Sequence, residues 1–376
     1  NHTETTEIYT LDLSSAASDV YKRQPDIIDP EGLAPEALIE RICRAGIVGL
    51  GGATFPTSPK LSRGKAHGIE TLIVNGVECE PYITCDDTLM RYRAAEVVRG
   101  GGYLQQILSP RATYICIEDN KPEAIAAMKQ ALAQHPLPDT EIVSIPTIYP
   151  SGGEKQLIQI LTGKEVPHGQ LAFDIGLLSQ NVGTCAAITQ AFEQGRPMIS
   201  RVVTLTGDNI TQPGNWEVRL GTPISHLIEL AGGYRHEESG QLVMGGSMMG
   251  FALSGSDVPI VKGSNCILVM REETIPKATG YHDECIRCGK CTEVCPARLL
   301  PQQLYWHARA QAYERTQEFH LFDCIECGCC STVCPSRIPQ VQYYRAAKRE
   351  IRAARKAQYK SDRARRRYEL LEQRQL

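Results

Sequence analysis

Hydrophobic positions in the N-terminal half of the chain follow two alternating periods. Short runs rich in β-branched residues predict strands at 71–75, 113–118 and 141–148. Apolar residues at helical spacing predict a helix at 35–46, with proline in its first turn and Gly46 at the C-terminal cap. Because strands that alternate with helices usually form a mostly parallel sheet, we expect an α/β domain.

Polar residues predict where two further helices of this domain begin. Asp87 is a candidate N-cap for a helix over 87–98. Asn120 and Glu123 have the spacing of a capping box for a helix over 120–134.

From about Arg201 the pattern changes to a smaller α+β module. Strands are predicted at 201–207, 241–246 and 266–270, with a short helix at 222–231 that is closed by two glycines. Methionines beside glycines can line a ligand surface, but they more often fill gaps in a core, and we expect that role for Met244, Met248 and Met249.

Two glycine-dense segments lie in the α/β part. Residues 46–57 contain four glycines within seven positions, and they follow a helix rather than a strand, which argues against a dinucleotide fingerprint. Residues 151–154 read Ser-Gly-Gly-Glu, a capping-box spacing in which each glycine costs a helix roughly 1 kcal/mol. Each segment has two interpretations. It is either a tight turn or a stretch of backbone that a ligand approaches closely. For residues 151–154 that ligand would be an anion.

The segment after the strand at 71–75 reads Gly-Val-Glu-Cys-Glu-Pro. Polar and acidic residues at the carboxyl end of a strand occupy the usual ligand position of an α/β sheet. This segment is therefore a further candidate for binding.

Eight of the 15 cysteines lie in two runs with the same spacing. Each run reads C-x2-C-x2-C-x3-C-P, the spacing of a bacterial ferredoxin with two [4Fe–4S] clusters, in which the fourth cysteine of each run ligates the other cluster. The spacing assigns one cluster to Cys285, Cys288, Cys291 and Cys334, and the other to Cys324, Cys327, Cys330 and Cys295.

Zinc and disulfides are the competing interpretations of the cysteines. Zinc sites take ligands in two pairs, whereas each run supplies three cysteines plus one. Disulfides need an oxidising compartment, and the seven other cysteines show no paired spacing, which favours a reducing cytosol. Cys329 lies between two ligands and is expected to be a spectator.

Composition excludes some classes of function. The net charge of −3 implies no bulk attraction to nucleic acid, and no apolar run approaches the ~20 residues that span a bilayer. Basic residues dominate from Arg345 onward, where we expect a long helix or fraying tail that is either solvated or docks on a partner or anionic lipid. Residues 1–24 show neither a signal peptide nor a period, and we expect them to be disordered or non-native.

With these motifs in view, the chain resembles the C subunit of the Rnf-type (Rsx) electron transport complex, an ion-translocating membrane oxidoreductase. The resemblance rests on GIVGLGGATFPTSPKL, IVNGVECEPYITCDD, YPSGGEKQLIQILTGKEVP and the two cysteine runs. The same segments more distantly resemble the FMN- and NADH-binding subunit of respiratory complex I.

The resemblance implies a set of cofactor contacts. It implies that the flavin lies against Gly49, Gly51 and Gly52 and the flavin-side pair Asn181 and Thr184, and that the nicotinamide nucleotide lies near Phe55 and Lys60. It also implies polar FMN/NADH contacts from Asn75, Glu78 and Glu80, and a glycine–acid turn at Gly152, Gly153 and Glu154. Val77 and Gly153 depart from the complex I pattern, which has aspartate and glutamate there, so the pocket is less acidic.

The resemblance also implies the architecture. We expect an α/β FMN/NADH-binding domain at 25–200, a β-grasp module of the soluble-ligand-binding (SLBB-like) type at 201–275, an α-helical ferredoxin-like 2[4Fe–4S] domain at 276–340 and a basic helical tail at 341–376.

The implied function is that of an NADH/ferredoxin-type oxidoreductase within a translocase. As a peripheral subunit on the cytoplasmic face of a bacterial inner membrane, it would pass electrons between NAD(H), non-covalent FMN, two [4Fe–4S] clusters and a ferredoxin-like partner subunit. Other subunits of the complex would do the membrane work. Two alternatives are a soluble flavin/iron–sulfur reductase of the cobalamin reductase type and a non-enzymatic iron–sulfur wire without flavin.

Overall fold

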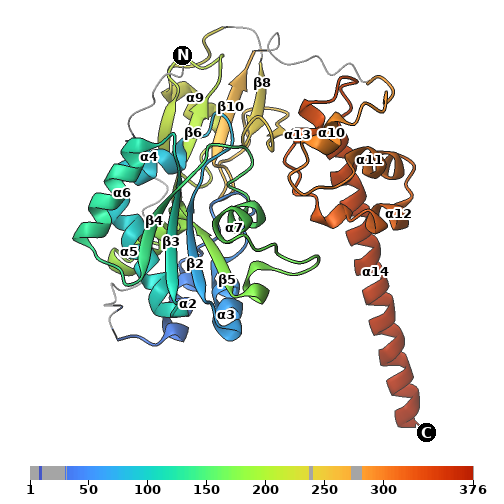
Figure 1. The fold of residues 1–376 in the computed structure, drawn as a ribbon, viewed down its shortest axis with the longest axis horizontal. Helices are drawn as coiled ribbons and strands as arrows, with labels where there is room; N and C mark the ends of the chain where they lie inside the picture. The colour runs from blue at the N-terminus through green and yellow to red at the C-terminus, as the bar shows by residue number, and fades with distance from the viewer. Residues whose placement is uncertain (1–7, 11–29, 31, 237–239, 272–281, 376) are drawn as a thin grey trace. The chain divides into compact units, whose positions relative to one another are not determined.

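The computed structural model describes residues 8–10, 30, 32–236, 240–271 and 282–375, which fall into two compact units divided after Lys277 (Figure 1). The first unit contains β1 (Ile8–Thr10), α2 (Pro35–Arg44), α3 (Thr57–His67), β2 (Thr71–Gly76), α4 (Cys85–Tyr92), α5 (Ala94–Leu108), β3 (Ala112–Glu118), α6 (Pro122–Gln134), β4 (Thr140–Ile145), α7 (Glu154–Thr162), η1 (Ala172–Ile175), β5 (Leu177–Asn181), α8 (Val182–Glu193), β6 (Ser200–Thr206), β7 (Gly214–Arg219), α9 (Ile224–Leu230), β8 (Gln241–Met244), β9 (Phe251–Ala252) and β10 (Cys266–Met270). The second unit contains α10 (Lys290–Glu293), α11 (Pro301–Arg309), α12 (Tyr313–Glu318), η3 (Leu321–Asp323), α13 (Cys329–Thr332) and α14 (Gln340–Gln375).

The predicted parallel sheet is present, with the strand order β4-β3-β2-β5. β2 lies between β3 and β5 and pairs in parallel with both, so the three strands end at one edge of the sheet. Alternate side chains of each strand point to opposite faces: Ile73 joins one apolar cluster, and Leu72 and Val74 join the other. Helices α2, α3, α5, α6 and α8 contribute to the larger cluster and α7 to the smaller, so both faces are covered.

Three predicted helix starts were wrong. Asp87 lies in the first turn of α4, which begins at Cys85, and a break at Arg93 separates α4 from α5. α6 begins after Lys121 without a side-chain cap, because proline at its first position sets the start. α7 begins after Gly153, also without a side-chain cap, because the Glu154 carboxylate pairs with Lys60 instead of closing a capping box.

The second part of this unit is a mixed sheet with the order β1-β7-β6-β10-β8-β9. Its core comes from alternate residues of β6, β7, β8 and β10 and from the apolar side of α9. Met244 is buried in this core, as expected, whereas Met249 is exposed. Within the stretch expected to lack structure, Ile8–Thr10 form β1, which pairs in parallel with β7; the other expectations for residues 1–24 lie outside the described residues.

The second unit is an internal repeat with an offset of 39 residues. The offset relates Cys285 to Cys324, the start of α11 to the start of α14, and Tyr305 to Tyr344. Backbone conformation repeats as well, because the left-handed φ angles recur in three pairs: Arg287 (58°) and Glu326 (59°), Gly289 (82°) and Gly328 (85°), and Arg298 (50°) and Arg337 (53°). The two cysteine runs therefore adopt the same fold.

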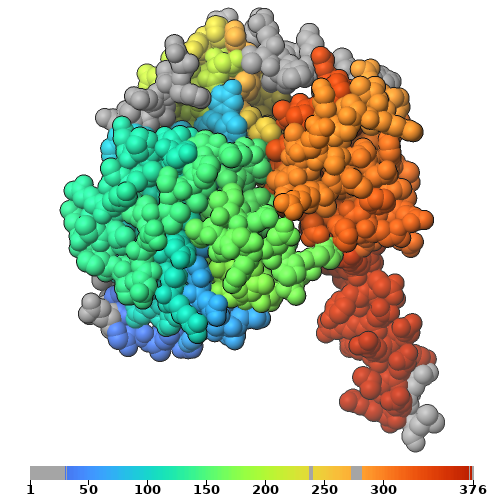
Figure 2. Space-filling model, viewed as in Figure 1, coloured from blue at the N-terminus to red at the C-terminus, as the bar shows by residue number. Residues whose placement is uncertain are grey.

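The expected basic C-terminal helix is present as α14, which has 36 residues. Its first turns pack into the core of the second unit through Val341, Tyr344, Ala347 and Ile351. Figure 2 shows the distal half of the helix, in dark red, standing clear of the rest of its own unit. Within the described part of the chain, no helix combines the length and the apolar character needed to cross a membrane.

Candidate iron–sulfur and flavin sites

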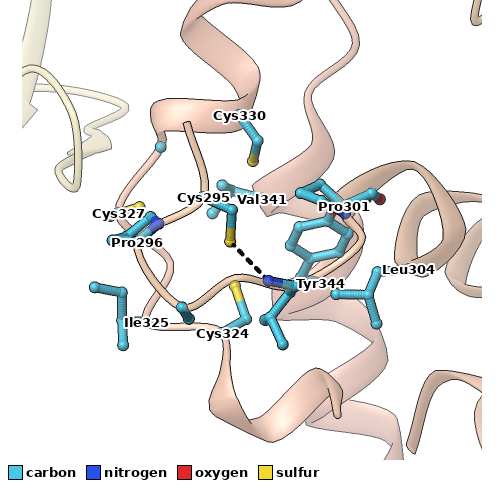
Figure 3. Close-up of a pocket in the computed structure, with 13 residues that line it drawn as sticks. Cys295, Pro296, Pro301, Leu304, Cys324, Ile325, Cys327, Cys330, Val341 and Tyr344 are labelled. Atoms are coloured by element: carbon cyan, nitrogen blue, oxygen red, sulfur yellow. Dashed lines mark hydrogen bonds between the residues drawn. The ribbon is translucent and has the colours of Figure 1, made fainter. Parts of the chain in front are cut away.

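Four cysteines from the two runs line one cavity in the second unit (Figure 3). Cys324, Cys327 and Cys330 come from the second run, and Cys295 comes from the end of the first. This is the set that the spacing assigned to one cluster. Four thiol sulfurs around an apolar cavity, with no carboxylate or imidazole in its lining, are the donor chemistry that a [4Fe–4S] cluster needs.

Backbone N–H groups already point at two of these sulfurs. Leu299 N–H donates to Cys295 Sγ at 3.4 Å, and Glu326 N–H donates to Cys324 Sγ at 3.4 Å. Burial raises the pKa of Cys324 to about 11 and the pKa values of Cys327 and Cys330 to about 12. The thiols are therefore protonated at neutral pH, and iron binding, which requires thiolates, must release those protons.

The second predicted set draws on the other ends of the two runs. Cys291 is buried, Cys285 and Cys334 are half-buried, and Cys288 is exposed. Ser336 Oγ donates to the backbone oxygen of Glu284 at 2.9 Å, which ties the chain beyond Cys334 to the chain before Cys285. This bond spans 52 residues and supports the crossed ligand assignment. Cys329 does not line the cavity, in keeping with its expected role as a spectator.

In the first unit, the glycine loop at 46–57 packs on the start of α8. Leu50 N–H donates to Thr184 Oγ1 at 3.0 Å, and Thr184 Oγ1 donates to Val48 O at 3.3 Å. A Cβ on Gly51 would lie 3.4 Å from Asn181, whose side chain caps α8 through Gly183 N–H. Three predicted flavin residues, Gly51, Asn181 and Thr184, therefore lie together at the carboxyl edge of the parallel sheet.

The other loop residues fix its shape and leave one aromatic ring in solvent. Gly49 N–H donates to Phe55 O at 2.8 Å. Gly52 has a φ of +126°, a backbone angle that residues with a side chain rarely adopt. The Phe55 side chain is 48% exposed, so its ring is accessible for stacking on a planar ligand.

Lys60 joins three elements at this edge. Its Nζ lies 2.7 Å from Glu154 Oε1 on α7 and 2.7 Å from Ser179 O on β5. Nearby, Asn75 Nδ2 donates to Gly152 O at 3.0 Å. These contacts bring together the predicted residues Lys60, Asn75, Gly152 and Glu154.

Gly152 is required by the protein's own backbone. A Cβ at this position would lie 2.2 Å from Val77 O, a distance that no side chain tolerates. At Gly153 a Cβ would meet the flexible end of Gln156 instead. Of the two interpretations of the glycine pair, the structure favours the tight turn for Gly152.

Glu78 and Glu80 both accept hydrogen bonds from protein backbone. Glu78 accepts from the N–H groups of Asp86 (2.8 Å) and Asp87 (3.0 Å) in the first turn of α4. Glu80 accepts from the N–H groups of Met248 (2.8 Å) and Met249 (2.9 Å) in the mixed-sheet module. The structure thus gives these two acids a bracing role that their position after a strand did not reveal.

A charged cluster beside Glu78, in which Arg201 is buried and Asp86 half-buried, was missed at the sequence level. Asp86 and Arg201 line a cavity of about 40 Å³, enough for water, and Asn181 Nδ2 donates to Asp86 Oδ2 at 2.6 Å. Lys121 Nζ donates to Glu78 O at 3.2 Å. Desolvation raises the pKa of Asp86, and it raises the pKa of Glu78 to about 8 with help from the negative charge of Asp86. These residues come from separate parts of the chain, so no local sequence pattern predicts that they cluster.

The carboxyl edge also holds buried polar atoms that have no partner within the described protein. They are Gln180 Nε2 near the end of β5, Thr57 Oγ1 at the start of α3 and Ser151 Oγ in the turn before α7. Leaving such an atom unpaired costs about 1–3 kcal/mol. Spare buried polar atoms beside a glycine-rich loop fit a polar, planar cofactor such as a flavin nucleotide.

Three domain models match the chain in order. The Nuo51 FMN-binding domain matches residues 42–190, the SLBB domain matches residues 202–252 and the 4Fe-4S dicluster domain matches residues 284–338. The expected fold classes and the domain types of both cofactors are thereby confirmed.

Curated relatives share this organisation at high identity. The C subunit of the ion-translocating oxidoreductase complex of Serratia proteamaculans is 52% identical over 336 residues, which are 89% of this chain and 47% of that protein. The proteins of the same name from Yersinia enterocolitica (54% over 316 residues; 84% and 45%) and Edwardsiella ictaluri (51% over 337 residues; 89% and 41%) are comparable. The chain is related to the C subunits of ion-translocating oxidoreductase complexes. It spans less than half the length of these three relatives.

Solved structures show that the fold extends beyond these relatives. An NAD+-reducing [NiFe]-hydrogenase in its H2-reduced state matches with a TM-score of 0.59 and 18% identity over 90% of this chain and 64% of that one. In the air-oxidised state the TM-score is 0.56, with 18% identity over 80% and 56% of the two chains. At this identity the likeness concerns the fold alone.

The crossed cysteine sets predict the iron content of the protein. Anaerobic reconstitution should give about eight iron atoms per chain, since each set completes one four-iron site. Cys295→Ser should halve the iron and destroy the cluster of the second run, while Cys285, Cys288 and Cys291 stay protected from alkylation. Iron near four in the unmodified protein, or zinc in its place, would contradict the assignment.

The glycine loop predicts a flavin-specific defect. Gly51→Val should remove FMN from the purified protein while iron content stays unchanged, because a branched side chain would occupy the space between the loop and Asn181. Gly255→Val is the matched control: a Cβ at that position meets nothing within 4 Å, so FMN should be retained. The readout is flavin released per chain, measured by fluorescence. Full flavin retention in Gly51→Val would show that the glycine serves only the turn.

Glu78 predicts a pH dependence of stability. Its folded-state pKa of about 8 lies above its ordinary value of 4.5, so folding takes up a proton between these pH values and stability falls as the pH rises through this window. The thermal midpoint of Glu78→Gln, relative to that of the unmodified protein, should therefore rise as the pH increases from 5 to 8.5. Glu141→Gln, an exposed position on β4, should show no such trend. A constant difference between the Glu78→Gln variant and the unmodified protein across this range would contradict the buried proton.

Proposed function

We propose that this chain is the electron-input part of an ion-translocating oxidoreductase complex. It passes electrons between NAD(H), FMN, two [4Fe–4S] clusters and a ferredoxin-like partner subunit. The observation that carries the proposal is the presence, on one chain, of an FMN-type α/β domain and of a cavity lined by four cysteines from both runs. The names of the curated relatives support the membership of a complex.

The flavin is proposed to lie at the carboxyl edge of the parallel sheet. The glycine loop, with Gly49, Gly51 and Gly52, would hold one side of it, and Asn181, Thr184 and Gln180 would supply polar contacts. A bound flavin accepts two electrons as hydride from NADH and passes them on singly, which a one-electron cluster requires. The protein's part is to hold the flavin against the nicotinamide and to keep bulk water away from both.

NAD(H) is proposed as the substrate on the Phe55 side of the same edge. The fold shared with an NAD+-reducing hydrogenase supports this proposal, as do the half-exposed Phe55 ring and the Lys60 ammonium that follows it in the first turns of α3. Val77 and Gly153 stand where the complex I pattern has acids, so the contacts to NADH differ from that pattern at these two positions.

The spectrum of the reconstituted protein tests the function. Flavin bands together with broad cluster absorbance that NADH bleaches would support the oxidoreductase. Cluster absorbance without flavin would favour the electron wire. A soluble reductase would be favoured if the protein carries all of its cofactors and its NADH oxidation is unaffected by membranes and by any membrane partner.

We further propose that the chain works as a peripheral subunit on the cytoplasmic face of the membrane, and that the distal half of α14 helps to dock it there. Beyond Lys356 there are six Lys or Arg residues against three Asp or Glu, although the whole chain carries −3. Lys360, Arg363 and Arg367 lie on one side of the exposed helix, since they are spaced at three and four residues. A solvated helix without a partner is the alternative.

Truncation after Lys356 tests the docking role of α14. This cut spares Arg345, Lys348 and Ile351, which contact the core of the second unit, so cofactors and NADH-dependent dye reduction should be unchanged. Sedimentation with vesicles that contain anionic lipid should weaken. Salt should strip the full-length protein more readily as its concentration rises, because surface charges are screened over about 8 Å at physiological ionic strength. Equal sedimentation of both forms would leave the helix with no docking role.

A further inference from the structure

The two cysteine loops of the second unit differ in charge at a repeated position. In the internal repeat, Arg287 in the first loop corresponds to Glu326 in the second, and Arg309 at the end of α11 corresponds to Lys348 on α14. Each loop therefore faces a helix that offers a cation. In the second half the acid, Glu326, lies between the first two cysteines of the loop, whereas in the first half Arg309 pairs with Glu284, which precedes the first cysteine and is largely exposed.

The second loop is bonded to its helix. Lys348 Nζ donates to Cys324 O at 2.6 Å and to Glu326 Oε1 at 2.8 Å, and Arg345 Nε donates to Glu326 Oε2 at 3.0 Å. Lys348 is only 4% exposed, so its charge is screened little by water. We call Glu326, Arg345 and Lys348 the latch.

The first loop has like charges at the two corresponding positions. Arg309 donates to Glu284 and to Tyr305 Oη instead, and the Arg287 guanidinium lies over the Trp306 ring, 5.2 Å from its centroid. Ile286, between the first two cysteines, is 67% exposed, and Cys288 is exposed as well.

The corresponding residues of the second loop are covered. Ile325 is half-buried and Cys327 is 7% exposed, and both line the four-cysteine cavity together with Val341 and Tyr344 of α14. The same backbone fold is thus closed in one half of the repeat and open in the other.

We propose that the latch keeps the second-run cluster closed to solvent, and that the first-run cluster, without this latch, is the one open to solvent and to an electron-transfer partner. This inference rests on the proposed function, because it requires both clusters. It makes Glu326 and Lys348 positioning residues: they act on the loop around a cluster and contact no substrate.

The order of cluster loss tests the proposal in the reconstituted full chain. The protein is exposed anaerobically to the iron chelator bathophenanthroline disulfonate in the presence of iodoacetamide. Alkylated peptides are then quantified by mass spectrometry, since a cysteine reacts only after it loses its iron. When half of the iron has left, Cys285, Cys288 and Cys291 should be alkylated, and Cys324, Cys327 and Cys330 should still be protected.

Latch variants should abolish the difference. Glu326→Gln and Lys348→Met should each speed alkylation of the second-run cysteines roughly tenfold, the usual consequence of losing a hydrogen bond to a charged group in a covered site. The reversed pair, Glu326→Lys with Lys348→Glu, should restore part of the protection. Arg309→Met changes the corresponding position of the first half and should leave the second-run rate unchanged.

Two outcomes would overturn the proposal: simultaneous alkylation of both runs in the unmodified protein, or latch variants that keep the original order and rates. Failure of the proposed function is distinguishable, because it would show as fewer than about eight iron atoms per chain before chelator is added. If Lys348→Met does not fold, Glu326→Gln, which keeps the shape and one acceptor oxygen, decides the question alone.

Discussion

The second unit depends on one geometric constraint: three cysteines spaced by two residues can occupy only one side of a cluster site. The fourth ligand must come from elsewhere, and the chain supplies it by repeating the run and lending one cysteine in each direction. Cys295 reaches the cavity of the second run, and the bond from Ser336 to Glu284 O closes the chain on the other side. With the predicted crossed ligands, neither half of the repeat would form its site alone. The helices α11 and α14, which begin at equivalent positions, complete the core that surrounds the cysteines.

A repeat with crossed ligands need not have equivalent halves. Backbone angles recur almost unchanged at an offset of 39 residues, yet Glu326 replaces Arg287 and draws its loop onto α14. The loop that carries Glu326 is the covered one, and removing either partner of a buried ion pair is strongly destabilising. The repeated fold gives the two cysteine loops the same backbone conformation, while single side chains change how exposed each loop is.

The first unit concentrates its polar groups at the carboxyl edge of a buried parallel sheet. The glycine loop, Lys60, Asn75 and the start of α8 meet there because β2 and β5 are neighbours in register. Glu80 links this edge to the mixed-sheet module through the N–H groups of Met248 and Met249. The acids that follow the strand thus have two roles. They lie beside a candidate site, and they accept hydrogen bonds from the elements around it.

Local patterns determined much of this protein. The doubled cysteine run predicted both the ligand sets and the type of cofactor, because spacing along a tight turn dictates which sulfurs can share a cluster. Alternating hydrophobic periods predicted the parallel sheet and the smaller α+β module. They did so because strand and helix periods are properties of consecutive residues.

Only the tertiary structure decided the roles of residues whose partners lie far along the chain. Gly152 is glycine because Val77 O approaches it, and Glu78 accepts hydrogen bonds from α4 rather than standing free. Both capping boxes failed because tertiary partners and a proline outweighed a local spacing. Arg201 and Lys348 are buried, and their burial follows from contacts that no local pattern records. The hydrophobic periodicity of a strand or helix depends on neighbouring residues, whereas the burial and charge pairing of these residues arise only when distant segments meet.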